Sequence, residues 1–159
     1  MPSPGQLSVE INIYAYAGAP WKTQAIVRRL LTTMYRAAPD GIIGNDDCGQ
    51  MSAWFVFSAL GFYPVDPVEA VYVFGAPLFD RAEVRVGDGR RLVVTAEGNA
   101  PDRPYVQAVT WRGRPWTRSW IAHADLVGGG TLAFRMGATP DRAFGRARVD
   151  RPPSTGNSG

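Results

Sequence analysis

The sequence GNDDCGQMSAWFVFSALGFYPV, residues 44–65, sets a polar cluster directly before a strongly apolar segment. The apolar part predicts a helix from about Gly49 to Leu60, because Gly61 is a typical C-terminal stop and Pro64 follows shortly after it. This helix is apolar nearly all round, so other structure has to enclose it. The stretch therefore predicts a buried helix that begins at a group of polar side chains.

Another helix is predicted ahead of it, from Pro20 to Ala38. Its apolar residues fall at helical spacing, at Val27, Leu30, Leu31, Met34 and Tyr35. Pro20 suits a first helical position, because its missing N–H would have no partner there. Asp40-Gly41 predicts a turn after the helix. Two helices cannot enclose each other, so the buried one needs further structure around it.

The pattern switches to period two after Pro67, which predicts strands. The strand-like runs are Val71–Phe74, Ala82–Val86, Leu92–Ala96, Tyr105–Trp111 and Thr131–Met136. Gly87-Asp88-Gly89 and Arg112-Gly113-Arg114 predict hairpin turns, and Ile121–Leu126 predicts a short helical turn. We expect a small antiparallel sheet with one packed face, followed from about Asp150 by a disordered tail rich in proline, glycine and serine.

Composition limits the classes of protein that fit. The 159 residues are 45% hydrophobic and 19% charged, as in globular domains. No apolar run reaches the roughly 18 residues of a membrane span. The first residues lack the pattern of a secretory signal, which leaves the compartment open. The net charge of +3 comes mostly from arginines spread through strands and turns, so we interpret it as a solvated basic surface and expect no nucleic-acid partner.

The polar cluster before the buried helix has two compatible interpretations. Asp46 or Asp47 caps the helix by accepting bonds from free backbone N–H groups. Alternatively, the same donors keep one carboxylate ionised, so that it can act as a general base toward water. The two aspartates cannot be the paired carboxylates of a glycosidase, because neighbouring side chains at a helix start diverge and cannot flank one sugar ring.

Other residues are weaker candidates. Trp21, beside Lys22 at a helix start, is the best aromatic candidate for ligand contact. His123 is the only histidine, and we interpret it as structural rather than as a metal ligand, since no ligand set surrounds it. Cys48 is the only cysteine; it excludes an internal disulfide and is interpreted as a small buried residue.

Two motifs resemble a known family. They are Tyr-Ala-Gly-Ala-Pro-Trp-Lys-Thr-Gln at 16–24 and the whole stretch 44–65. Both are similar to the end of the calcium-dependent α-mannosidases of glycoside hydrolase family 92. The likeness continues through Gly75-Ala76-Pro77-Leu78-Phe79 and further short motifs of the sheet half, as far as about Ser154.

The resemblance implies an exo-acting mannosidase that inverts the anomeric centre, with an (α/α)₆ catalytic barrel and a bound calcium. It implies that Asp47 is the general base, with Asp46 beside it, and Asn45 stands where relatives carry a second Asp. We take Asn45 and Trp21 as the expected substrate-binding residues. The family's catalytic acid and an acidic, His-rich stretch have no counterpart in this sequence. No metal ligand is therefore carried over, and the calcium ligands are expected largely outside the chain.

We therefore expect an α+β chain: two helices from the end of an (α/α)₆ barrel, followed by a small antiparallel β-sheet or sandwich unit. The expected division is an atypical N-terminal segment at 1–13, the helical end at 14–66, the β unit at 67–149 and the tail at 150–159. The leading hypothesis is an incomplete hydrolase of terminal α-mannosides, α-1,2-linked, whose partners are mannose-containing glycans and the missing N-terminal part of the enzyme. The alternatives are a carbohydrate-binding or interaction module, with Trp111, Trp116 and Trp120 aligned on one exposed face, and an inactive gene fragment.

Truncation has a physical consequence that can be measured. A twelve-helix barrel at about 11–12 residues per helix needs well over 130 residues before any loop, and only two of its helices are expected here. The helix at 49–60 then exposes an apolar flank. We predict that the chain expressed alone self-associates, as measured by analytical ultracentrifugation; a monodisperse monomer that melts cooperatively would contradict this.

Overall fold

The computed structural model describes residues 13–37, 56–66 and 70–153 of the chain. Short helical turns at 13–16 and 56–60 accompany the named elements. In chain order these are α2 (Pro20–Ala37), β1 (Phe62–Asp66), β2 (Val71–Phe74), β3 (Arg81–Arg85), the 3₁₀ turn η2 (Gly87–Gly89), β4 (Arg91–Glu97), β5 (Tyr105–Trp111), β6 (Arg114–Trp116), β7 (Trp120–Ala122), α4 (His123–Val127), β8 (Gly130–Gly137) and the 3₁₀ turn η3 (Arg148–Asp150).

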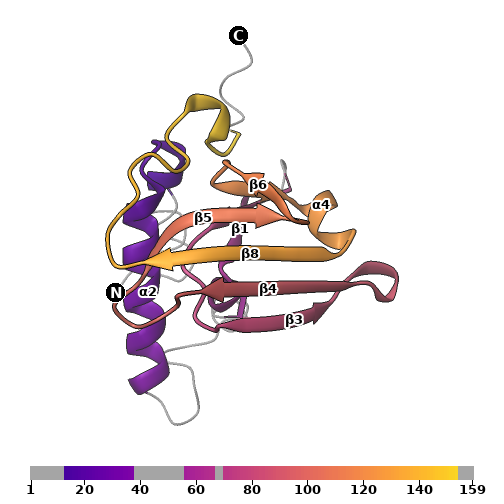
Figure 1. Cartoon of the computed structure of the whole chain (residues 1–159), viewed down its shortest axis with the longest axis horizontal. Helices are drawn as coiled ribbons and strands as arrows, with labels where there is room; N and C mark the ends of the chain where they lie inside the picture. Colours follow the sequence, from indigo (N-terminus) through magenta and orange to yellow (C-terminus); the bar gives the residue numbers. More distant parts are fainter. Residues whose placement is uncertain (1–12, 38–55, 67–69, 154–159) are drawn as a thin grey trace.

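The strands form two sheets with one long helix beside them. A three-stranded sheet has the order β1-β2-β7, and a five-stranded sheet has the order β3-β4-β8-β5-β6. Figure 1 shows α2 running across one end of the five-stranded sheet, close to the ends of β5 and β8. The expected combination of helix and small β unit is confirmed for the part of the chain that the structure describes.

The core lies between the two sheets. Alternate residues of β4 and β8 point inward, so that Leu92, Val94 and Ala96 are buried while Val93 and Thr95 are not, as period two requires. The Phe134 ring of the larger sheet meets Phe74 of the smaller one edge-to-face, with centroids 5.3 Å apart. This contact joins the two layers into a sandwich.

One strand pairing departs from the predicted antiparallel pattern. β4 and β8 are parallel, with Val94 beside Leu132 and Ala96 beside Phe134, whereas the other pairings are antiparallel. A parallel pair needs a long crossover connection. The chain between β4 and β8 provides it, since it forms β5, β6, β7 and α4 before it returns. The alternation of apolar and polar residues within one strand does not indicate whether that strand pairs in parallel or antiparallel with another.

Three short strands are missing from the sequence-based prediction. They are β1, β6 and β7. β1 lies within 14–66, the range expected to be helical. It was not predicted because Pro64 was interpreted only as a residue that follows the end of a helix. Proline is tolerated there because β1 is an edge strand. β6 and β7 are each 3 residues long, too short for a period of two to be visible.

Both predicted hairpin turns are present. Asp88 and Gly89 have positive φ in the turn between β3 and β4, and Arg112 and Gly113 do so between β5 and β6. Consecutive left-handed residues match the right-handed twist of the strands they connect. The predicted helical turn at 121–126 corresponds to α4.

The first predicted helix is confirmed as α2. Its buried residues Val27 and Leu31 pack with Tyr63 and Leu78 in a small second core. The second predicted helix, 49–60, is described only over 56–60, and it ends at Gly61 as expected. Gly61 has φ +103, and a Cβ there would lie 3.1 Å from Cβ of Pro77, so the stop requires glycine. No helix in the described ranges is long and apolar enough to cross a membrane.

The beginning of the predicted disordered tail is ordered, so that expectation is wrong for residues 150–153; residues 154–159 lie outside the described part. The Asp150 backbone oxygen accepts a hydrogen bond from the Ser119 N–H at 2.9 Å, and its carboxylate accepts one from Thr117 at 2.8 Å. Pro152 is buried. Long-range contacts therefore hold a segment whose composition alone resembles a linker.

The contact between Phe74 and Phe134 yields a prediction. Replacing Phe134 by alanine leaves a cavity between the sheets and lowers the free energy of unfolding by about 3–5 kcal/mol. The measurement is urea unfolding at a fixed protein concentration, since self-association changes apparent stability. The control is Thr131→Ser on an exposed site of the same strand, expected to change stability by no more than about 0.5 kcal/mol. Equal effects of the two substitutions would contradict the sandwich core.

Candidate functional site

The predicted site falls in two parts of the chain. Asn45, Asp46 and Asp47, together with Cys48, lie outside the described residues. Trp21, the fourth predicted site residue, lies in the first turn of α2. The structure also describes the end of the helix that follows the aspartates, at 56–60, so the elements on both sides of the predicted site are seen.

A tight turn sets the position of Trp21. The helical turn at 13–16 closes with a hydrogen bond from Ala19 N–H to Tyr14 O at 2.8 Å. Gly18 follows in the left-handed region with φ +81, and Pro20 then starts α2 with its ring fully buried. Glycine and proline thus fix the direction in which the helix begins.

Cations surround the Trp21 ring. The Lys22 ammonium nitrogen is 5.3 Å from the ring centroid, and the Arg142 guanidinium carbon is 4.9 Å from it. Both distances are those of cation–π contacts. Arg142 comes from the segment after β8 and so arrives from far along the chain. Trp21 is half-buried and presents an aromatic surface in a positively charged setting.

A loop of the β half holds both helical segments in place. This anchor loop, residues 75–78, is Gly75-Ala76-Pro77-Leu78. Its Gly75 N–H donates to Gly61 O, and its Leu78 N–H donates to Ala59 O, both at 2.9 Å. The end of the helix that follows the predicted aspartates is therefore bound to the anchor loop.

Arg28 of α2 binds the same loop. Its side chain is almost fully buried, and its guanidinium donates to Pro77 O at 2.6 Å, to Ala100 O at 2.7 Å and to the Asn99 side chain. No ion pair joins it to an acidic side chain of the described ranges. Desolvation by burial lowers the pKa of Arg28. The guanidinium thus serves as a clamp between α2 and two loops of the sandwich.

Gln24 makes a further contact one helical turn earlier. Its buried side-chain oxygen accepts a hydrogen bond from Val106 N–H at 2.9 Å. The β5–β8 register shifts between Val106 and Ala108, a bulge that disturbs the ladder locally. Gln24 therefore supplies a hydrogen-bond acceptor to β5 at the bulge and fixes the position of α2 relative to that strand.

The sequence reading missed Gln24, Arg28 and Arg142 as positioning residues. A signal for the first two was present, because polar residues four apart lie beside Val27 and Leu31 on the predicted buried face of the helix. No local signal exists for Arg142, because its contact with Trp21 depends on the path of the chain after β8.

His123 has a partner, in agreement with its structural interpretation. Its Nδ1 lies 2.9 Å from the Tyr72 hydroxyl, and the two rings stack with centroids 5.8 Å apart. Burial raises the pKa of the Tyr72 phenol. His123 thus links the start of α4 to β2.

The predicted platform of three tryptophans is not present. Trp111 is in the core at 7% exposure, because it stands at an inward position of β5, opposite Leu132. Trp116 is half-buried and donates its indole N–H to Trp120 O at 2.8 Å. Three aligned, exposed rings are therefore excluded, and the carbohydrate-binding module that depended on them loses its structural basis.

The described residues give no support for a resident calcium among themselves. In those ranges no group of three or more His, Cys, Asp or Glu side chains is placed so that it could hold a metal ion. Calcium requires several oxygen ligands. We therefore assign it no residue of the described part and derive no chemical step through it.

The sandwich and helix match solved glycoside hydrolases. The α-mannosidase BT3965 of Bacteroides thetaiotaomicron is 34% identical over 91% of this chain and 20% of its own, with a TM-score of 0.86. The inverting mannosidase BT2199 of the same organism is 39% identical over 93% of this chain and 20% of its own, with a TM-score of 0.85. An uncharacterized secreted glycosidase of Arthroderma benhamiae is 29% identical over 91% of this chain and 19% of its own.

The family follows from the sequence match. The model of the glycosyl hydrolase family 92 catalytic domain matches residues 9–138. The chain belongs to glycosyl hydrolase family 92. It spans about a fifth of the length of the relatives it matches.

The Arg28 clamp yields a second prediction. Arg28→Met removes the bonds to Pro77 O and Ala100 O and leaves buried carbonyls without a donor, so stability falls by about 2–4 kcal/mol. The neighbouring Arg29 is exposed, and Arg29→Met is the matched control, with a change within about 0.5 kcal/mol. Urea unfolding at one protein concentration measures both variants. If Arg28→Met is as stable as its control, the clamp does not hold α2.

Proposed function

We propose that this chain is the C-terminal part of an exo-acting, inverting α-mannosidase that removes terminal α-1,2-linked mannose from glycans. The observation that carries the proposal is its likeness, at 34–39% identity, to two solved mannosidases. One of them, BT3965, has also been solved in complex with mannoimidazole. The match to the family's catalytic domain over residues 9–138 supports a part in catalysis.

Asp47 is the proposed general base. It comes just before the predicted start of the apolar helix, where free N–H groups and the helix dipole would favour an ionised carboxylate. In an inverting reaction the base takes a proton from water as that water attacks the anomeric carbon, on the face opposite the leaving oxygen. Asp46 assists by capping the helix, so that the base is fixed in place.

Asn45 and Trp21 are the proposed sugar contacts. An amide donates and accepts hydrogen bonds, as a hydroxyl-rich ligand requires, and an indole ring gives a flat apolar surface for the face of a pyranose. The cations beside Trp21 keep that ring in a polar environment at the start of α2. Trp21 lies in the first turn of α2, the helix that the Arg28 clamp holds against the sandwich.

The remaining components are proposed to come from outside this chain. They are the catalytic acid, which donates a proton to the leaving oxygen, and the ligands of the calcium that the family resemblance implies. The helices at 20–37 and 56–60 are proposed to close an (α/α)₆ barrel contributed by the rest of the enzyme. Ile13 and Val56 are exposed apolar residues on the described helical segments. Their exposure supports a contact of these segments with the rest of the barrel.

A chimera tests this function. The 159 residues replace the corresponding fifth of BT2199, and the product is assayed on α-1,2-mannobiose with and without a calcium chelator. We expect the chimera to release mannose that NMR detects first as the β-anomer, because inversion of an α-linkage yields β-mannose. Asp47→Asn should lower kcat by about 10²–10⁴-fold.

The controls separate the parts of the proposal. Asp46→Asn should cost less than Asp47→Asn, and the isolated chain should release no mannose with or without calcium. Cleavage by the isolated chain would mean that an overlooked acid is present. Full activity of the folded Asp47→Asn chimera would rule out Asp47 as base, and α-mannose as the first product would rule out inversion.

A further inference from the structure

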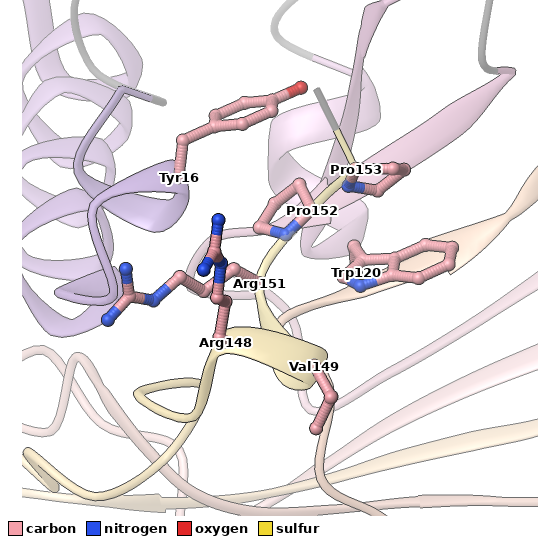
Figure 2. A pocket seen from close by; sticks show the side chains of 7 residues that line it. All are labelled: Tyr16, Trp120, Arg148, Val149, Arg151, Pro152 and Pro153. Carbon is pink, nitrogen blue, oxygen red and sulfur yellow. The ribbon is translucent and has the colours of Figure 1, made fainter. Parts of the chain in front are cut away.

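A cavity lies where residues 148–153 pass the helical turn at 13–16 and β7. Its volume is about 700 Å³, within the range of small-molecule sites. Figure 2 shows its lining residues, which are Tyr16, Trp120, Arg148, Val149, Arg151, Pro152 and Pro153. None of these is a residue of the proposed mannosidase site.

Flat apolar surfaces form one side of the cavity. Trp120 and the rings of Pro152 and Pro153 lie together, and Tyr16 lies opposite Trp120 across Pro152 (Figure 2). Trp120 is half-buried, and Arg118 lies 5.2 Å from its ring centroid. Rings of this kind pack against the carbon face of a sugar while its hydroxyl groups stay in water.

A guanidinium group forms the other side. The exposed side chain of Arg148 points toward Tyr16 (Figure 2), and no hydrogen bond or ion pair engages it within the described part of the chain. Asp150, two residues further along the chain, is bound elsewhere, because its carboxylate accepts a hydrogen bond from the Thr117 hydroxyl. Arg148 is therefore available to bind an anion.

The segment that carries Arg148 is fixed rather than loose. Its position follows from the bonds of Asp150 O to Ser119. Arg151 turns away from Trp120 (Figure 2) and donates from Nε to Arg146 O at 3.0 Å. The backbone position of Arg148 relative to the aromatic side is thus set by the fold, which favours a preformed site.

We propose that this cavity is an accessory site for an anionic sugar, meaning a monosaccharide unit that carries a carboxylate or a phosphate group. The pyranose ring packs on Trp120 and the proline rings, and the anionic group binds the Arg148 guanidinium. A neutral sugar leaves the guanidinium without a partner, and an inorganic anion leaves the apolar side unused. The site is independent of the mannosidase proposal.

Equilibrium dialysis of the 159-residue chain tests the proposal, since this method tolerates self-association. The probes are glucuronic acid, glucose 6-phosphate, mannose and inorganic phosphate. We expect at least one anionic sugar to bind with a millimolar or lower Kd and at least about tenfold more tightly than mannose or inorganic phosphate. The two anionic sugars distinguish a carboxylate ligand from a phosphate ligand.

Variants locate the binding. Arg148→Gln should weaken the favoured anionic sugar at least about tenfold, whereas Arg85→Gln, an exposed arginine on β3 that does not line the cavity, should leave its Kd unchanged. Trp120→Leu should weaken the sugar but not inorganic phosphate, with circular dichroism as the check on folding. Equal Kd values for mannose and the anionic sugars would overturn the proposal. So would equal effects of the two arginine variants, binding of inorganic phosphate as tight as that of the favoured anionic sugar, or no binding at all.

Discussion

The arrangement of the molecule depends on the anchor loop at 75–78. Its backbone N–H groups donate hydrogen bonds to Ala59 O and Gly61 O, where the helix at 56–60 passes into β1. Its Pro77 oxygen accepts a hydrogen bond from the buried Arg28 guanidinium. A loop placed between two β-strands would satisfy these groups with water if it were exposed. Because most of the loop is buried, its polar groups need partners within the protein. The two helical segments supply several of them, which couples the helical half to the sandwich.

Periodicity was sufficient for the long elements of the fold. α2 and the strands β4, β5 and β8 were predictable because each shows its own repeat over several residues. β2 was predicted as a short apolar run, and three of its four residues are buried. The parallel β4–β8 pair, the edge strand β1 and the bound residues 150–153 were not. Each depends on a partner distant in the chain, which a local pattern does not contain.

The candidate site was predictable to a different extent. Trp21 was predicted because it stands next to Lys22 at a helix start, and Lys22 lies beside its ring; its contact with a sugar stays a prediction. Arg142 was assigned to a solvated basic surface, because charge clustering in the sequence cannot distinguish an arginine in water from one that stacks on an aromatic ring. The roles of Asn45, Asp46 and Asp47 rest on family resemblance and stay predictions, since those residues lie outside the described ranges.

One segment, residues 142–151, relates the start of α2 to the accessory cavity. It supplies Arg142 to Trp21 and Arg148 to the cavity. Between them, Gly145 has φ +67, and a Cβ there would lie 2.8 Å from Cβ of Ser119 and 3.0 Å from Cγ of Pro20. Only glycine lets the backbone pass so close to both the first residue of α2 and the approach to β7. The backbone positions of the two arginines are therefore set relative to α2, although the sequence around them has the composition of an exposed basic turn.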